Sequence, residues 1–425
     1  MDMESDEAAA RSLAAVPGGG GSDFLSRLPD HLLVDILLRL CTKDAVATTV
    51  LSRRWRAVWP GLPHLNFDGV DPSVPARALA SYQDLAAFDI QRLAVSPNQV
   101  DAQETSAWLA LAAPRLTGPL HLDISRALSE EALDDLLMAD EVDDDDQEAL
   151  EFPCFVRATE IRLDLAFLAP VLPPIGVFEA LRSIFLHNFR CQGQIIFNDM
   201  VFPSLQHLTM NRARCLNVLI NSNALVSVHL SYFMLLQQLA IMAPGLQQLE
   251  VLRCFYDAPI PVANITAESL EVLSWDGPYD AEFVHFGEMP CLWRLRAPPI
   301  FTLRWQEFQM AQICARFLNR FAAVNQLELH MSLGCAFEIE LRYMYVKPEM
   351  EGSLLLMGDL TIPDVNVLVL SLDTNGHASE RSVLRLLAKC YCIRKLNLSF
   401  QMQDQYSWCQ MVCMNKNAHW LLEQN

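Results

Sequence analysis

Few residues in this sequence have the types and spacing that metal binding would need. The best candidates lie near the C-terminal end, at Cys390, Cys392, Cys409, Cys413 and His419. Thiolates and imidazoles are preferred zinc ligands, but the spacing C-x-C followed by C-x3-C departs from the paired C-x2-C of strong zinc sites. Cys390 and Cys392 also flank a predicted strand, where a buried cysteine acts as a small apolar residue. We therefore favour a structural role and predict no metal site.

A second candidate is the carboxylate-rich segment at 130–151, which contains twelve Asp and Glu residues, including the run from Asp143 to Asp146. Carboxylates are calcium ligands, but the segment lacks the spaced ligands and central glycine of an EF-hand loop. A block of like charges at this density repels itself and stays hydrated. We therefore expect a solvated loop insertion, and a calcium site is the less favoured alternative.

The motifs of common enzyme classes are absent from the sequence. There is no Walker loop, dinucleotide-binding glycine fingerprint, G-x-S-x-G elbow or H-E-x-x-H motif. No cysteine lies in a recognisable nucleophile motif. We therefore expect a protein that is not an enzyme and that has no cofactor.

Composition limits the possible partners and compartments. Of the 425 residues, 52% are hydrophobic, and the formal net charge is −20. This excludes a wholly disordered chain and argues against binding to nucleic acid or to an anionic membrane. The first 21 residues are acidic and glycine-rich, unlike a secretory signal, so we expect a disordered extension. The cysteines are scattered instead of forming a dense disulfide framework, so we expect a reducing compartment, the nucleus or the cytoplasm.

An internal repeat indicates the elements that would position functional residues. Apolar residues at positions one, four and six of a short pattern recur in segments starting at Ala158, Leu181, Leu205, Leu225, Leu246, Leu270, Leu292, Val324, Val365 and Ile393. The first seven starts are 20 to 24 residues apart, and a further copy begins at Thr117. Such a period and pattern are the signature of leucine-rich repeats. We predict an α/β solenoid with parallel strands on its concave face, and with positions four and six in the core.

Positions three, five and seven of each strand then face the concave side, where a target protein would bind. The candidate target-binding residues at these positions are Arg162, His187, His207, His229, Glu250, Asp276, Arg294, Arg296 and Glu328. Charges of both signs occur among them. For each residue, a merely hydrated position is the alternative.

A dense helical block precedes the repeats, from Asp23 to Phe67. Its first helix carries a broad apolar stripe of Leu32, Leu33, Ile36, Leu37 and Leu40, and Pro29 lies where a first-turn proline is tolerated. Thr42 can cap a second helix and Ser52 a third. Three short helices bury too little surface to be robust alone, so we expect a partner. The alternative is that the block is the helical cap of the repeat array.

The segment LPDHLLVDILLRL, the TKDAVATTVLSRRW core and the trailing AVWPGLPHLNFD together resemble the F-box of plant F-box proteins. In that family the F-box binds the Skp adaptor of a Skp–cullin–F-box ubiquitin ligase. The resemblance implies a docking face formed by Leu28, Pro29, Leu33, Ile36 and Leu40. It also implies that Val50, Leu51, Trp55 and Trp59 supply the second half of the domain and its core. An exposed apolar helical face supports such docking.

The far end resembles the start of the FBD-type tail of F-box/leucine-rich-repeat proteins, in NGHASERSVLRLLAKCYCIRKLNLSF and then WCQMVCMNKNAHW. In that family the tail continues into another strand, so we expect a truncated tail here. The expected domains are a disordered extension at 1–21, the F-box at 22–68, a linker or helical cap at 69–116, repeats at 117–345 with the acidic insertion at 130–151, and terminal repeats with the tail at 346–425.

These features predict a substrate-recognition subunit of a Skp–cullin–F-box ligase. The F-box would bind the adaptor and, through it, the cullin, while the repeats hold an unidentified target protein near the catalytic partner. Two alternatives stay open: a leucine-rich-repeat scaffold without a ligase, and a small-molecule co-receptor. Loss of adaptor binding would favour the first alternative, and ligand-dependent target binding the second.

Overall fold

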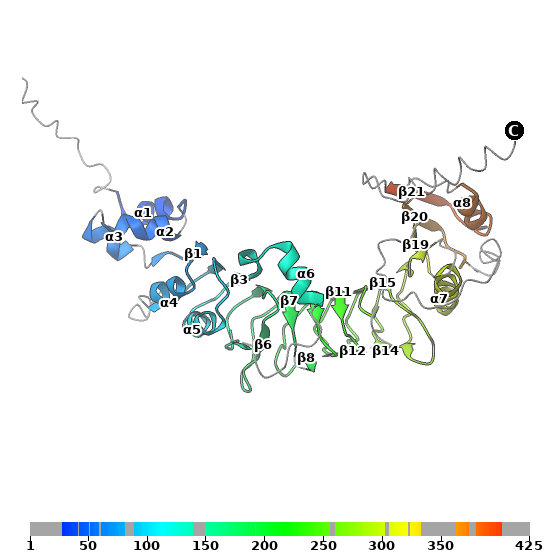
Figure 1. Cartoon of the computed structure of the whole chain (residues 1–425), viewed down its shortest axis with the longest axis horizontal. Helices are drawn as coiled ribbons and strands as arrows, with labels where there is room; N and C mark the ends of the chain where they lie inside the picture. Colours follow the sequence, from blue (N-terminus) through cyan, green and yellow to red (C-terminus); the bar gives the residue numbers. More distant parts are fainter. Residues whose placement is uncertain are drawn as a thin grey trace, which may run out of the picture. The chain divides into compact units, whose positions relative to one another are not determined.

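The computed structural model describes residues 28–40, 42–50, 52–58, 61–80, 89–138, 149–191, 193–255, 260–301, 306–321, 324–332, 362–373 and 380–401. The chain divides into two compact units, Met1–Leu62 and Pro63–Asn425. The first unit is helical, and the second combines long parallel sheets with helices (Figure 1).

The N-terminal unit consists of three short helices, as the sequence predicts. They are α1 (Asp30–Leu37), α2 (Thr42–Ala47), which continues into a 3-10 turn at Thr48–Val50, and α3 (Arg53–Val58). The Ser52 hydroxyl accepts a hydrogen bond from the Trp55 amide at 3.4 Å, so Ser52 caps α3 as expected. The small core contains Leu33, Leu37, Ala45, Trp55 and Val58, all buried.

One long parallel sheet runs through the second unit. In spatial order its strands are β1 (His64–Val70), β2 (Arg92–Pro97), β3 (Pro119–Asp123), β5 (Glu160–Asp164), β7 (Ser183–Arg190), β9 (His207–Arg214), β11 (Ser227–Met234), β13 (Gln248–Leu252), β15 (Val272–Asp276), β17 (Arg294–Arg296), β19 (Gln326–Ser332), β20 (Val367–Asp373) and β21 (Lys395–Gln401), with β18 (Ile300–Phe301) beside β19. Each of the ten repeats, and the copy at Thr117, supplies one strand. The leucine-rich-repeat solenoid is therefore confirmed.

The return segments of the repeats form the opposite wall of the solenoid. In the middle repeats they are strands of a second sheet, in the order β16 (Val284–Phe286), β14 (Val262–Thr266), β12 (Gln238–Met242), β10 (Asn217–Asn221) and β8 (Gln194–Asn198). β4 (Ala149–Glu151) and β6 (Ala169–Val171) form a separate pair. Helices replace these strands toward both ends: α4 (Ser73–Ala80) and α5 (Ala102–Ala112) at one end, and α7 (Gln306–Arg320) and α8 (Glu380–Leu387) at the other (Figure 1).

The core lies between the two walls. Positions four and six of the repeats, such as Leu208 with Met210 and Leu249 with Val251, have no exposed surface, whereas the alternate residues point outward. Trp275 is also fully buried, and its indole nitrogen donates a hydrogen bond to the Pro278 carbonyl oxygen at 3.3 Å. The inward orientation predicted for these positions is confirmed.

The solenoid begins earlier than the sequence indicates. We expected a linker or helical cap at 69–116, but β1 and β2 belong to the large sheet, and α4 and α5 are the return segments of the first repeats. Leu65, Leu93 and Leu120 occupy matching register positions on β1, β2 and β3. Helical return segments lengthen these repeats, so the spacing of their leucines departs from the 20 to 24 residues of the central ones.

The cysteines differ in part from expectation. Cys191 and Cys215, which follow the neighbouring strands β7 and β9, are joined by a disulfide, where we expected separate thiols. Their Cα atoms are 5.1 Å apart, because equivalent positions of adjacent repeats meet in the stack. Cys254 and Cys314 are fully buried, and burial raises the pKa of both thiols to about 12, which fits small apolar residues. In the described parts of the chain, no helix is long and apolar enough to cross a membrane.

Candidate functional site

The helical unit presents exposed apolar side chains beside a small core. Val50 is 81% exposed, and Leu32, Leu38 and Leu40 are also exposed. Of the docking residues implied by the resemblance, Pro29, Leu40 and Val50 are exposed, and Leu28 and Ile36 are half-buried. Leu51 and Trp59 lie outside the described residues.

Leu33 does not lie on the surface where the docking face was placed. It is 0% exposed, and Trp55 is also buried. Leu33 and Leu37 are four residues apart on one side of α1, and that side faces the core of the unit. Leu33 is therefore a core residue, and the accessible apolar side chains are those of Leu32, Leu38, Leu40 and Val50.

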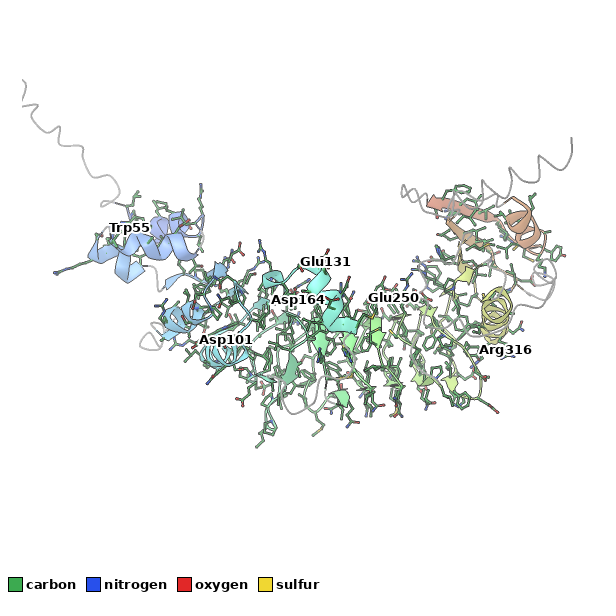
Figure 2. The ribbon with its side chains drawn as sticks, in the orientation of Figure 1. Trp55, Asp101, Glu131, Asp164, Glu250 and Arg316 are labelled. Atoms are coloured by element: carbon green, nitrogen blue, oxygen red, sulfur yellow. A yellow bond between two sulfur atoms is a disulfide. The ribbon has the colours of Figure 1, made fainter. Side chains whose placement is uncertain are left out.

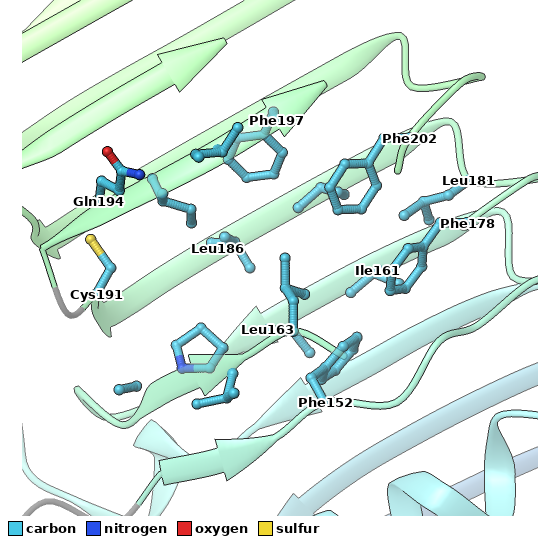
Figure 3. Close-up of a pocket in the computed structure, with 17 residues that line it drawn as sticks. Phe152, Ile161, Leu163, Phe178, Leu181, Leu186, Cys191, Gln194, Phe197 and Phe202 are labelled. Carbon is cyan, nitrogen blue, oxygen red and sulfur yellow. The ribbon is translucent and has the colours of Figure 1, made fainter. Parts of the chain in front are cut away.

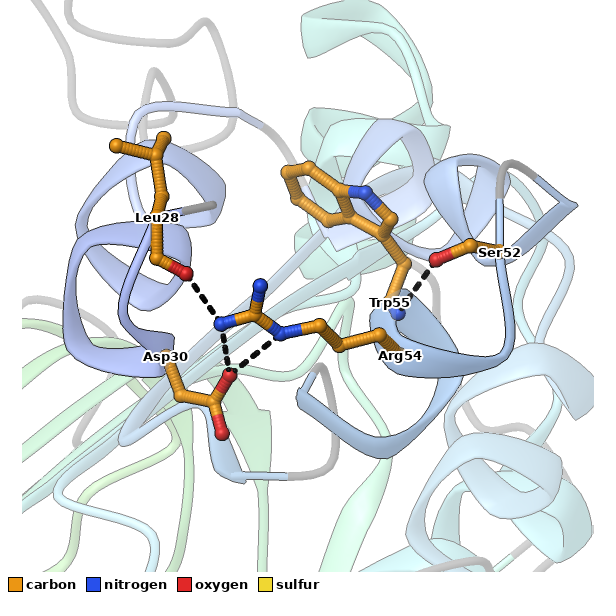
Figure 4. Close-up of polar contacts among 5 residues, drawn as sticks. All are labelled: Leu28, Asp30, Ser52, Arg54 and Trp55. Atoms are coloured by element: carbon orange, nitrogen blue, oxygen red, sulfur yellow. Dashed lines mark hydrogen bonds and ion pairs between the residues drawn. The ribbon is translucent and has the colours of Figure 1, made fainter. Parts of the chain in front are cut away.

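An arginine fixes the turn that leads into α1 (Figure 4). Arg54 donates hydrogen bonds to the backbone oxygen of Leu28 and to Asp30 Oδ1, the latter from Nε at 2.9 Å and from Nη2 at 2.6 Å. The Pro29 carbonyl oxygen accepts from the amides of Leu32 and Leu33 at 3.1 and 3.3 Å. These bonds hold the Leu28–Pro29 turn against α3. We did not single out Arg54 from the sequence, although it lies within the quoted core segment.

The large sheet brings all nine candidate target-binding residues onto its concave side, where Figure 2 labels Asp164 and Glu250. Register places them in three rows across the strands. The middle row contains Arg162, His229, Glu250, Arg296 and Glu328, one flanking row contains His207 and Arg294, and the other contains His187 and Asp276. The sequence pattern thus identified their common face.

Several of these charged groups pair with one another across neighbouring strands. His229 Nδ1 lies 2.9 Å from Glu250 Oε2, and Arg294 Nη2 lies 2.5 Å from Glu328 Oε1. The hydrogen bond from His229 holds the pKa of the Glu250 carboxyl below its ordinary value. Arg162 pairs with Glu160 at 2.6 Å, and its guanidinium carbon lies 3.8 Å from the centre of the Phe185 ring. Such a surface offers alternating donors, acceptors and charges to a protein partner.

The histidines of this face have other roles than metal binding. His207 Nδ1 lies 2.8 Å from the Ser227 hydroxyl, and burial lowers the pKa of His187. Among the described residues, no group of three potential ligands could hold a metal ion. Cys390 Sγ donates to the Leu386 carbonyl oxygen at 3.3 Å. Cys409, Cys413 and His419 lie outside the described part of the chain.

The acidic insertion is partly helical, which corrects the solvated loop that we expected. Residues Glu130–Met138 form α6, and β4 begins at Ala149. The helix forms because the Ser129 hydroxyl accepts from the Ala132 amide at 3.2 Å and because Glu130 and Glu131 lie in the positive first turn. Leu133 is buried. Ser129 followed by two glutamates was a helix-start signal that the density of charge obscured.

Three arginines bind α6 to the ends of β7 and β9. Arg212 Nη2 lies 2.5 Å from Asp134 Oδ1, and its Nη1 lies 3.6 Å from Glu130 Oε2. Arg190 and Arg214 donate to the carbonyl oxygens of Leu136 and Leu137 at 3.3 and 2.9 Å. Cations at the last carbonyls of a helix complement its dipole. The sequence did not predict this contact, because more than 50 residues separate the arginines from α6.

Comparison with known proteins identifies the N-terminal unit. Residues 25–65 match the F-box domain family. A putative F-box/FBD/LRR-repeat protein of Arabidopsis thaliana is 26% identical over 286 residues, 64% of this chain and 55% of the relative. An F-box/FBD/LRR-repeat protein of the same plant is 30% identical over 207 residues, 45% and 42% of the two chains. A third relative, a putative F-box/FBD/LRR-repeat protein of Arabidopsis thaliana, is 64% identical over 45 residues, 11% and 10% of the two chains.

The chain thus spans little more than half of the length of these curated relatives at most. No solved structure gives a significant match. The matched domain coincides with the helical unit, and the relatives' names include the repeat that forms the solenoid. The chain is therefore an F-box protein with a leucine-rich-repeat solenoid, and its relatives are plant F-box/FBD/LRR-repeat proteins.

Proposed function

We propose that this chain is the substrate-recognition subunit of a Skp–cullin–F-box ubiquitin ligase. The observation that carries the proposal is the F-box match at residues 25–65, on a compact helical unit that exposes apolar side chains. Val50 and Leu40 are 81% and 41% exposed on a unit with only a small core of its own. Exposed apolar side chains gathered on a small unit are typical of a protein-binding surface.

In this proposal the two units have different partners. The F-box binds the Skp adaptor and, through it, the cullin, while the concave face of the solenoid binds the target protein. The three rows of charged and polar side chains supply specificity through paired charges and hydrogen bonds. The chain contributes no reacting group, because its role is to hold the target close to the catalytic partner.

The adaptor contact can be tested with a single exposed residue. Val50→Asp places a charge on the proposed docking surface and removes no core side chain. We expect it to weaken binding of purified Skp adaptor at least tenfold by isothermal titration calorimetry. Ile175→Asp is the matched control, because Ile175 is 89% exposed in the second unit and should leave adaptor binding unchanged.

Two outcomes would contradict the proposal. If the folded wild-type chain does not bind the adaptor, the ligase role is wrong and a repeat scaffold is the better interpretation. If Val50→Asp and the double variant Leu28→Ala/Pro29→Ala both bind as the wild type does, the docking surface has been misplaced. Circular dichroism of each variant establishes beforehand that the helices are intact.

A further inference from the structure

The return wall of the solenoid is interrupted at one place. β8 is the last strand of the five-stranded sheet, and β6 belongs to the separate pair with β4. The two strands come from consecutive repeats, and the equivalent strands of the following repeats, such as β10 and β12, pair along their whole length. On the other wall, β5 and β7 pair without a break. The interruption therefore affects only the return side.

A cavity of about 360 Å³ lies behind this interruption (Figure 3). Its inner wall consists of core positions of β5 and β7, among them Ile161, Leu163 and Leu186. Phe178, Leu181 and Phe202 lie at one end, and Gln194 and Cys191 at the other (Figure 3). The outer rim includes Val171, Leu172 and Ile196, which are between 37% and 45% exposed.

The burial of the core side chains differs between this place and its neighbours. Ile161, Leu163, Ile184 and Leu186 are each 3% to 5% exposed. The equivalent residues of the next two repeats, Leu208, Met210, Val228 and Leu230, are all 0% exposed. The solenoid is close-packed along β9 and β11 but leaves the apolar side chains of β5 and β7 accessible. Protein interiors rarely contain voids of this size, so the cavity suits a ligand.

The lining defines the chemistry that would fit. Of the seventeen described residues around the cavity, none is charged, four are phenylalanines, and only Gln194 has a polar side chain with amide groups. A cavity of about 150 Å³ lined by apolar side chains can bind benzene. We propose that this cavity binds a compact, uncharged molecule of two to three apolar rings, with one polar group facing the Gln194 amide.

A peptide segment fits the cavity less well than a small molecule. A polypeptide would bring its backbone amides into a lining that offers almost no hydrogen-bond partners. The rim also lies on the return side, away from the concave face. Ligand and target protein would therefore use opposite walls of the solenoid. The proposal goes beyond the ligase role, because it requires neither the adaptor nor a target.

The test uses the full-length chain and the neutral fluorescent probe N-phenyl-1-naphthylamine. We expect saturable binding of one probe per chain, with increased probe fluorescence and a higher melting temperature of the protein. Ala169→Leu fills part of the cavity, because Ala169 is buried in its lining. This variant should bind the probe at least tenfold more weakly. Titrations are run with and without reductant, because Cys191 lies at one end.

Exposed apolar residues outside the cavity provide the controls. Ile175→Ser and Met200→Ser remove side chains that are 89% and 82% exposed and should bind the probe as the wild type does. If Ala169→Leu does not fold, Ile196→Trp at the rim is used instead, since the larger side chain obstructs entry. The proposal is wrong if the wild type shows no saturable binding, if the folded cavity variant binds normally, or if the surface variants lose binding equally.

Discussion

Ionisable groups on the concave face differ in what surrounds them. Glu250 is hydrogen-bonded to His229, which stabilises the carboxylate and lowers its pKa. His187 is instead shielded from water, and burial lowers its pKa despite the attraction of Asp164, while Arg162 lowers it further. The two residues therefore respond to acid in different ranges of pH. Glu250 matters below about 4.5, its ordinary value, whereas His187 matters around 6.5.

His187 makes the solenoid less stable in mild acid. A histidine whose pKa is lowered by folding binds a proton more readily in the unfolded chain, so stability is lost as the pH falls through about 6.5. We expect the free energy of unfolding to decrease between pH 7.5 and pH 5.5. His187→Gln should remove part of this decrease, as measured by urea denaturation, whereas His285→Gln at an exposed position should not. Equal pH dependence in all three proteins would contradict this assignment.

Individual elements divide into those that build cores and those that cover surfaces. In α1, Leu33 and Leu37 are core residues, so replacing either with alanine would cost about 2–5 kcal/mol and unfold a unit this small. Loss of adaptor binding in such a variant would say nothing about docking. Helix α6 is the opposite case: it buries Leu133 but is otherwise attached to β7 and β9 by arginine contacts.

The attachment of α6 can be weakened without changing the sheet. Arg212→Gln removes the ion pair with Asp134 and should cost about 1 kcal/mol locally, since these side chains are partly hydrated. Amide hydrogens of Glu130–Met138 should then exchange roughly fivefold faster by mass spectrometry. Arg253→Gln is a matched control, because both arginines have left-handed backbone angles, with φ of 53° and 54°. Unchanged exchange in α6 of the Arg212 variant would show that the arginine does not hold it.

At the scale of the whole molecule, each unit has its own core. Leu33 and Trp55 are buried within Met1–Leu62, and Leu230 and Trp275 within Pro63–Asn425. In a solenoid, each repeat is stabilised mainly by contacts with its neighbours. The two units therefore have the elements that independent folding requires. This distinguishes an F-box unit from a helical cap, which the first repeat would need for its stability.

Deletion of residues 1–62 distinguishes these two roles. We expect the remaining chain, Pro63–Asn425, to melt within about 4 °C of the solenoid transition in the full chain, because its core is intact. It should also lose all binding to the adaptor. Differential scanning calorimetry and adaptor titration measure both effects. A solenoid that no longer unfolds cooperatively after the deletion would mean that the helical unit serves as its cap.

The sequence alone determined the features that depend on local periodicity. Positions four and six of the repeats alternate with outward positions because successive residues of a strand point to opposite faces, so both the core and the nine concave residues could be named. The three helices of the F-box followed from caps and an apolar stripe. Strands β1 and β2 escaped notice because helical return segments changed their spacing.

Only the tertiary structure decided which distant segments meet. The burial of Leu33 depends on how α1 is oriented in its unit, and the pairing of Cys191 with Cys215 depends on the stacking of β7 on β9. The docking of α6 joins a segment at 130–138 to arginines near 190 and 214. The cavity arises where β6 and β8 fail to pair. No pattern within a single repeat encodes these contacts, because each depends on the relative placement of two repeats or two helices.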